Sequence, residues 1–159
     1  MSSSMNDNEK NDDFKKSNSC VTDSAKNLNN AMHGLDNSIL KIGNNNESLI
    51  SRLKTEIEGI LEKKFGLNFI AVMNFHMKIK LDVEEPYEVL WCEPHAFYEK
   101  LKELFGEEGT SLIFIVIGEE LVRSGLIERQ REIIDLMRVR DYEAKCKLQN
   151  IWQKLTAKS

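Results

Sequence analysis

The residues LNFIAVMNFHMKIKL, at positions 67–81, decide between the two folds that this sequence allows. Their second half, residues 75–81, alternates apolar side chains with polar ones, which is the pattern of a half-buried strand. Their first half, from Phe69 to His76, places apolar side chains on most sides of a helix. Periodicity alone does not distinguish these two interpretations.

A second apolar run, LIFIVI at residues 112–117, has the same ambiguity. It is rich in β-branched residues, as buried strands are, but it continues without a break into residues 118–122, which have helical character. We favour a buried helix that ends near Gly125.

Two other segments carry clear helical patterns. In the first, Gly66 is placed to end a helix whose apolar stripe consists of Leu49, Leu53, Ile57, Ile60 and Leu61. The second segment, residues 94–105, has Pro94 at its first position and is followed by Gly106 as a stop.

The predicted fold class is therefore all-α, with a compact helical domain at residues 47–125. The alternative is an α+β fold that has short strands at residues 69–81 and 111–117. Residues 1–46 are rich in Ser, Asn and Asp and contain only a faint helical repeat. We expect a disordered or marginally helical tail there, because so few apolar side chains cannot offset the entropy of ordering the chain.

The last segment, residues 126–159, has apolar residues at spacings of three and four over about four heptads, which predicts one long amphipathic, coiled-coil-like helix. If two such helices pair, the dimer seam consists of Ile127, Ile134, Met137, Asp141, Ala144, Leu148, Ile151 and Leu155. Asp141 would then be a polar intrusion that fixes the register. The same stripe can pack back on its own domain almost as readily, and the sequence leaves this alternative open.

The composition is that of an ordinary folded protein, with 41% hydrophobic and 30% charged residues. The longest apolar run, residues 112–117, is far shorter than the roughly 18 residues that a membrane-spanning helix needs, so we expect no membrane segment. Three cysteines, an odd number, favour a reducing compartment, and the predicted location is the cytoplasm.

The sequence carries no recognisable catalytic motif, since it has neither a G-x-S-x-G nucleophile motif nor a phosphate-binding loop. Cys92 and His95 are spaced like a zinc-ligand pair, but a structural zinc site needs four ligands and no second pair exists. His76 lies in an apolar stretch, where a hydrogen-bonded core histidine is commoner than a cofactor ligand. We therefore predict no enzyme activity, no metal and no cofactor.

Residues 65–122 contain a distinctive pattern, a Pro-x-x-Phe helix start at Pro94 followed by Leu-x-x-Leu-Phe-Gly-x-x-Gly at residues 101–109. Together with the apolar stretch 69–77 and the segment Lys80-Leu81-Asp82-Val83, this pattern resembles the Nitrosopumilus output domain, a small archaeal family found in thaumarchaeal signalling proteins. The resemblance covers just over a third of the chain. It implies an all-helical fold, with residues 67–80 helical, and a non-enzymatic role in signal output, and it transfers no site residue.

These observations favour a protein-interaction or signal-output module that dimerises through its C-terminal helix. The expected partners are a second copy of the chain and another protein of a signalling or regulatory pathway. One alternative is a transcription-associated protein that contacts DNA through Arg129, Arg131, Arg138 and Arg140, although interleaved acidic residues make nucleic acid a less favoured partner. Another alternative is a sensor of a small ligand or cofactor, with an apolar pocket near His76.

Overall fold

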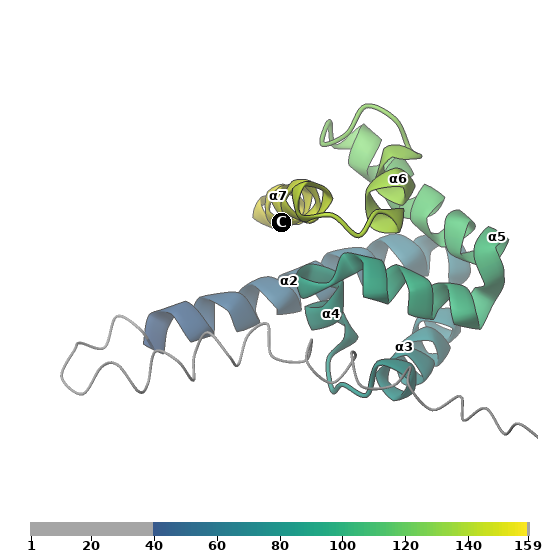
Figure 1. Cartoon of the computed structure of the whole chain (residues 1–159), viewed down its shortest axis with the longest axis horizontal. Coiled ribbons are helices and arrows are strands. Elements are labelled where there is room, and N and C mark those ends of the chain that lie inside the picture. Colours follow the sequence, from purple (N-terminus) through teal and green to yellow (C-terminus); the bar gives the residue numbers. More distant parts are fainter. Residues whose placement is uncertain (1–39, 159) are drawn as a thin grey trace, which may run out of the picture. The chain divides into compact units, whose positions relative to one another are not determined.

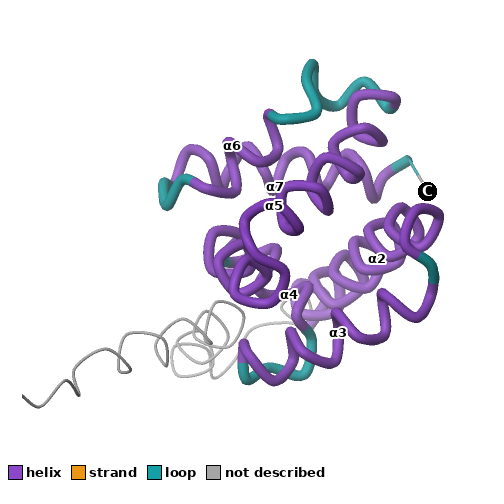
Figure 2. Tube along the Cα trace, turned by 90° about the vertical axis from the view of Figure 1, so that its right-hand side faces the viewer, coloured by secondary structure: helices purple, strands orange, loops and turns teal. Residues whose placement is uncertain are grey.

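The computed structural model describes the backbone of residues 40–158 and the side chains of residues 45–158. Over this range the chain forms six helices and no strand (Figure 1, Figure 2), which confirms the all-α prediction. Both segments of the alternative α+β fold are helical, since 69–81 lies in α3 (Leu67–Leu81) and 111–117 lies in α5 (Pro94–Arg123). The helix that the family resemblance implies at residues 67–80 is therefore present.

The central helix is α2 (Leu40–Phe65), which contacts α3, α4, α5 and α7 and lies between α3 and α7 in both views (Figure 1, Figure 2). It begins earlier than predicted, and Gly43 and the asparagines after it do not break it. Each Gly or Asn costs a helix only about 1 kcal/mol or less, which the packing of the following turns offsets. The predicted tail up to residue 39 lies outside the described residues.

The connections on either side of α3 use left-handed backbone conformations. Gly66 separates α2 from α3 with a φ of 82°, which glycine adopts without the steric cost of a Cβ atom. Asp82 ends α3 with a φ of 52°, a conformation that Asp and Asn tolerate better than other residues. The next helix, α4 (Pro86–Cys92), starts where the Glu85 carboxylate accepts a hydrogen bond from the backbone N–H of Tyr87 at 3.3 Å.

Helix α5 bends at Gly106, which has φ 72° and ψ 174° inside the helix. The predicted helix at residues 94–105 and its stop at Gly106 are present as the first half of α5. The second half ends two residues before Gly125, which is close to the predicted end. Gly125 has a φ of 68°, and the backbone N–H of Leu126 donates back to the carbonyl of Leu121 at 2.9 Å, so the end of α5 is capped by its own chain.

The prediction of one helix over residues 126–159 is wrong. The structure instead has turns at residues 124–131 and two shorter helices, α6 (Glu132–Arg138) and α7 (Tyr142–Ala157). Apolar spacings of three and four are the same for two helices packed on one domain as for a continuous coiled coil, so the spacing did not reveal the break.

The break between α6 and α7 is produced by two extended residues. Val139 has φ −91° and ψ 124°, and Asp141 has φ −137° and ψ 142°. The Asp141 carboxylate accepts a hydrogen bond from the backbone N–H of Glu143 at 3.0 Å. Asp141 therefore acts as the N-cap of a new helix and does not occupy a polar position in a seam.

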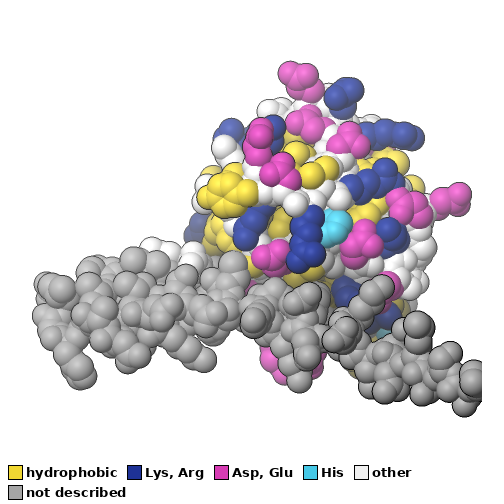
Figure 3. All heavy atoms as spheres, viewed as in Figure 1, with side chains coloured by type: hydrophobic (Ala, Val, Ile, Leu, Met, Phe, Trp, Pro, Cys, Tyr) yellow, Lys and Arg dark blue, Asp and Glu magenta, His cyan; other side chains and the backbone are white. Residues whose placement is uncertain are grey.

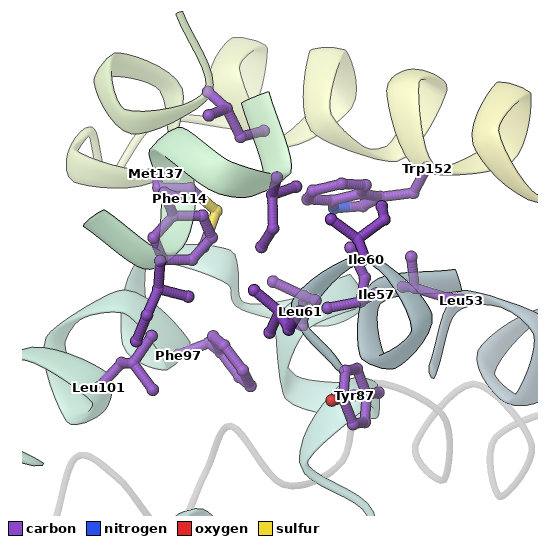
Figure 4. Close-up of a cluster of buried hydrophobic side chains, with 14 of the residues drawn as sticks. Leu53, Ile57, Ile60, Leu61, Tyr87, Phe97, Leu101, Phe114, Met137 and Trp152 are labelled. Carbon is purple, nitrogen blue, oxygen red and sulfur yellow. The ribbon is translucent and has the colours of Figure 1, made fainter. Parts of the chain in front are cut away.

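All six helices pack around one core. Figure 4 shows Trp152 of α7 pointing toward Ile60 of α2, and Phe114 of α5 lying beside Met137 of α6. Trp152 and Met137 are fully buried. Residues 126–158 therefore share the core of the domain predicted at residues 47–125 and do not form a separate stalk.

Candidate docking surface on helix α3

Helix α3 has two apolar faces, and only one of them is buried. The buried face consists of Ile70, Met73, Met77 and Leu81, which point into the core. On the opposite face, Val72, Phe75 and Ile79 are 53%, 62% and 63% exposed. We call these three residues, together with Leu67 at the N-terminal end of the helix, the α3 stripe.

The α3 stripe is a continuous feature and not a scatter of single side chains. Val72, Phe75 and Ile79 lie within about 60° of one another around the helix axis, because successive helical residues are about 100° apart. These three residues extend over about 10 Å at 1.5 Å per residue, and Leu67 lies a little over one turn before them, about 80° around the helix from Phe75. Ala71 is exposed beside it and adds a further apolar side chain.

A helix that is apolar all round is normally buried on all sides. By contrast, α2 and α7 have polar side chains on their solvent-facing sides; in α7 these include Lys147, Gln153 and Lys154. Single exposed apolar residues are ordinary on protein surfaces, but a contiguous apolar patch marks a site of interaction. The α3 stripe is the longest such patch on one helix among the residues with described side chains.

A shallow depression adjoins the C-terminal end of the α3 stripe. It has a volume of about 410 Å³ and is lined by Phe75, Lys78, Ile79, Asp82, Val83 and Glu84. Val83 is partly buried against the core, and three of the six lining residues are charged. The depression thus joins the apolar side chains of the α3 stripe to the charged residues Lys78, Asp82 and Glu84.

The charged residues in and just before α3 are all basic. Residues 63–81 contain four lysines and no carboxylate, in a chain whose net charge is −4. Lys80 pairs with Glu103 of α5 at 3.3 Å. Lys78, which borders the depression, has no ion-pair partner within the described part of the chain. Carboxylates appear only after the helix ends, at Asp82 and Glu84.

The N-terminal end of α3 lacks the groups that usually stabilise a helix start. Its N-cap residue is Gly66, no side chain caps its free N–H groups, and its first turn contains no acidic residue. The first backbone N–H groups of a helix carry a partial positive charge, which a nearby carboxylate stabilises.

Polar contacts on the inner side hold α3 firmly in place. The Asn74 amide donates a hydrogen bond to the Glu58 carboxylate of α2 at 2.6 Å, and the Tyr87 hydroxyl of α4 donates to the Asn74 carbonyl at 3.4 Å. Burial, and then the nearby charges of Glu58 and Glu85, hold the pKa of Tyr87 well above its usual value, so this hydroxyl stays protonated. The α3 stripe is therefore presented by a fixed helix.

The residues predicted for a dimer seam lie inside the domain. All except Asp141 are buried, and the most exposed of them, Ile151, is only 8% exposed. These buried residues are Ile127, Ile134, Met137, Ala144, Leu148, Ile151 and Leu155. The exposed seam that we predicted for this segment is thus corrected: its side chains contact their own domain, which is the alternative that the sequence left open.

The arginines of the DNA-binding alternative do not lie on one continuous helix. Arg129 and Arg131 lie in the turns before α6, and Arg140 lies in the turn after it. Arg138 stacks on the Tyr98 ring at 5.9 Å, donates to the Tyr98 hydroxyl at 3.0 Å and pairs with Glu107. On the face shown in Figure 3, basic and acidic side chains alternate. The geometry of a straight basic helix laid along a groove is absent here.

Neither His76 nor His95, the two histidines within the described residues, lies where the sensor alternative would place a ligand-binding histidine. His76 is exposed on α3, next to the Phe75 ring at 5.4 Å, and does not line the depression described above. His95 Nδ1 lies 3.3 Å from the carbonyl oxygen of Met137, while Cys92 is buried in α4. Within the described residues, no three His, Cys, Asp or Glu side chains come together as a metal site.

Comparison with protein-family models, with curated proteins and with solved structures gave no match. Of the helices within residues 40–158, none is both long enough and apolar enough to cross a membrane.

The α3 stripe was missed at the level of the sequence, although its signal was present. Apolar residues at Phe75, Met77, Ile79 and Leu81 suggested a strand because they alternate. In a helix, the same alternation places apolar side chains on two opposite faces, with Met77 and Leu81 inside and Phe75 and Ile79 outside. The alternation of apolar and polar residues at positions 75–81 thus indicated a helix that is apolar on two opposite faces.

Proposed function

We propose that this chain is a non-enzymatic protein-interaction module in which another protein surface covers the α3 stripe. The observation that carries the proposal is the exposed apolar face of α3, opposite a face that is already buried in the core. Covering apolar surface stabilises a complex by about 25 cal/mol per Å². A contact along Val72, Phe75 and Ile79 is the largest gain of this kind that the described side chains offer.

The firm seating of α3 supports the same proposal. Binding is weakened when a flexible segment must be ordered, and a surface that is already rigid avoids this loss. Asn74 and Tyr87 hold α3 against α2 and α4 through hydrogen bonds on its inner side. The exposed side chains of the α3 stripe therefore lie on a helix that is anchored to its neighbours before a partner binds.

The biological role that we propose is signal output, as the resemblance of residues 65–122 to an archaeal output family implies. In this role the partner belongs to a signalling or regulatory pathway and the complex forms in the cytoplasm. Assembly into a homo-oligomer is part of the proposal, with α3 replacing the C-terminal segment as the contact surface.

The test is the native size of the full chain from cells that make it, cross-linked before lysis so that a weak complex survives dilution. We expect the wild-type chain to elute in a complex well above its 18.4 kDa monomer mass. The double variant Phe75→Asp with Ile79→Asp should elute as the monomer, because two carboxylates cannot be buried without partners. Both positions are more than half exposed, so the fold itself should tolerate the change.

A matched control is Val139→Asp, which places the same charge at an apolar residue that is 49% exposed and lies between α6 and α7. This variant should remain in the complex. A wild-type chain of monomer size, or a complex that survives both substitutions in α3, would contradict the proposed function.

A further inference from the structure

We infer that the occupant of the α3 stripe is a second copy of this chain, bound through its own α3 in the antiparallel direction about a two-fold axis. This inference rests on the proposed function and names its partner. Homodimers with two-fold symmetry use the same patch on both copies, so the patch must be complementary to itself. The charges at the two ends of α3 meet this requirement, with an uncapped N-terminal end and carboxylates that follow the C-terminal end.

The spacing along the stripe fixes the register of the pair. A two-fold axis that passes between Val72 and Phe75 places Val72 of each copy opposite Phe75 of the other. The same axis places Ile79 of each copy over Asn68 of the other. In this register apolar side chains face each other at Val72 and Phe75, while Ile79 packs over the polar residue Asn68. Ala71 is small, which allows the two helix axes to approach within the usual 8–10 Å.

Charge complementarity selects the antiparallel direction. In this direction the C-terminal end of each α3 lies beside the N-terminal end of the other. Asp82 and Glu84, which follow the helix, then approach the free N–H groups after Gly66 of the second copy. That helix end has no side-chain cap and no acidic residue of its own, so a carboxylate from outside would stabilise it.

Repulsion between lysines also favours the antiparallel arrangement. A parallel pair would place the Lys78 residues of both copies side by side. In the antiparallel pair their Cα atoms lie roughly 13 Å apart along the helix axes, beyond the screening length of about 8 Å at physiological salt. Repulsion between the two lysines is therefore largely removed.

The surface area that two α3 helices can bury limits the affinity of the dimer. Stable interfaces of standard size bury about 800 Å² on each partner, and a single helix of four turns offers less than this. We therefore expect a reversible dimer whose dissociation constant lies at about 1–100 µM. Such a dimer forms or dissolves with modest changes in concentration.

The experiment is sedimentation of the purified full chain over a concentration series of about 2–500 µM, a range chosen to bracket that constant. The expected result is a monomer–dimer equilibrium for the wild-type chain and for the control Val139→Asp. Phe75→Asp should remain monomeric at every concentration. The pH and salt are kept constant so that only the exposed side chain differs.

The register and direction have their own test. Asp82→Asn removes a charge, and asparagine tolerates the left-handed backbone at this position. The interaction between residue 82 and the helix end of the other copy occurs twice in a symmetric dimer, so both are lost together. The dimer should therefore weaken by about 3- to 30-fold at low salt. This difference should disappear at about 1 M salt, where charges are screened within about 3 Å.

Three results would overturn the inference. The first is a purified chain that stays monomeric up to the highest concentration while a larger complex persists in cells, which would remove the homo-oligomer and leave an interaction module with a different partner. The second is a dimer that Phe75→Asp does not change. The third is a monomeric chain that binds anionic lipid vesicles and loses this binding in Phe75→Asp, since that would assign the α3 stripe to a membrane.

Discussion

Gly118 lies where α5 meets the turn before α6, and it has no room for a side chain. A Cβ atom added at this position would lie 3.0 Å from the carbonyl carbon and from the Cα atom of Gln130, and closer still to the carbonyl oxygen. The obstacle is backbone, which cannot rotate away as a flexible side chain can. The close approach of these two segments therefore depends on one missing methyl group.

We predict that Gly118→Ala lowers the free energy of unfolding by about 1–3 kcal/mol, because overpacking forces the turn away from α5. The measurement is urea unfolding, with the midpoint shifted and the slope unchanged. Gly59→Ala in α2 is the control: no atom lies within 4 Å of its added Cβ, so a gain of up to about 1 kcal/mol is expected from helix propensity. Equal effects at both glycines would contradict the steric argument.

At the scale of elements, α5 and α6 are joined by a cluster of three side chains, the half-exposed Arg138 and Glu107 and the buried Tyr98. Arg138 of α6 donates hydrogen bonds to the Tyr98 hydroxyl and to Glu107, and Tyr98 also donates to Glu107 at 3.2 Å. Glu107 directly follows the bend at Gly106. Partial desolvation raises the pKa of Glu107, but hydrogen bonds from Arg138 and Tyr98, with the charges of Arg138 and Lys102, outweigh it and lower that pKa below 4.5.

A lowered pKa in the folded state means that ionised Glu107 favours folding above pH 4.5 and that this contribution disappears as the pH falls through the folded-state pKa. We predict that Glu107→Gln lowers the melting temperature at pH 7 by no more than about 3 °C, because exposed pairs are screened by solvent. The difference between the two proteins should shrink as the pH falls below 4.5. A difference that grows toward acid pH would contradict the assigned partners.

Some helix boundaries could be predicted from the sequence and others could not. The stripe of α2, the proline start of α5 and the glycine stops at Gly106 and Gly125 could be predicted, because each depends on local rules of periodicity and backbone conformation. The break at Asp141 could not, since an N-cap aspartate and a polar seam residue look alike in a repeat of three and four. Which apolar face of α3 is exposed depends on the helices packed around it and not on its own residues.

At the scale of the whole molecule, the described residues should unfold as a single unit. Leu148 and Trp152 of α7 are completely buried, and α7 contacts α2, α4, α5 and α6. The C-terminal helix is thus part of the same cooperative structure as the central helix. A C-terminal helix that paired only with a second copy would instead unfold independently of the rest.

We predict that Leu148→Ala lowers the stability of the entire domain by about 2–5 kcal/mol, the range found for buried leucines. Far-UV circular dichroism and tryptophan fluorescence should report the same lowered transition, as expected for two-state unfolding. Gln153→Ala, on the exposed side of α7, is the control and should change stability by less than about 0.5 kcal/mol. Two separate transitions in the Leu148 variant would show that α7 is an independent unit.

The packing of α7 against α2 also has a consequence for biosynthesis. Translation delivers α2 long before α7, which supplies Trp152 as a neighbour of Ile60 (Figure 4). Domains usually fold as they emerge from the ribosome, N-terminal parts first. Here the earliest described helix keeps an uncovered apolar flank until the codons of α7 have been read, and exposed apolar surface of this kind favours aggregation of the nascent chain.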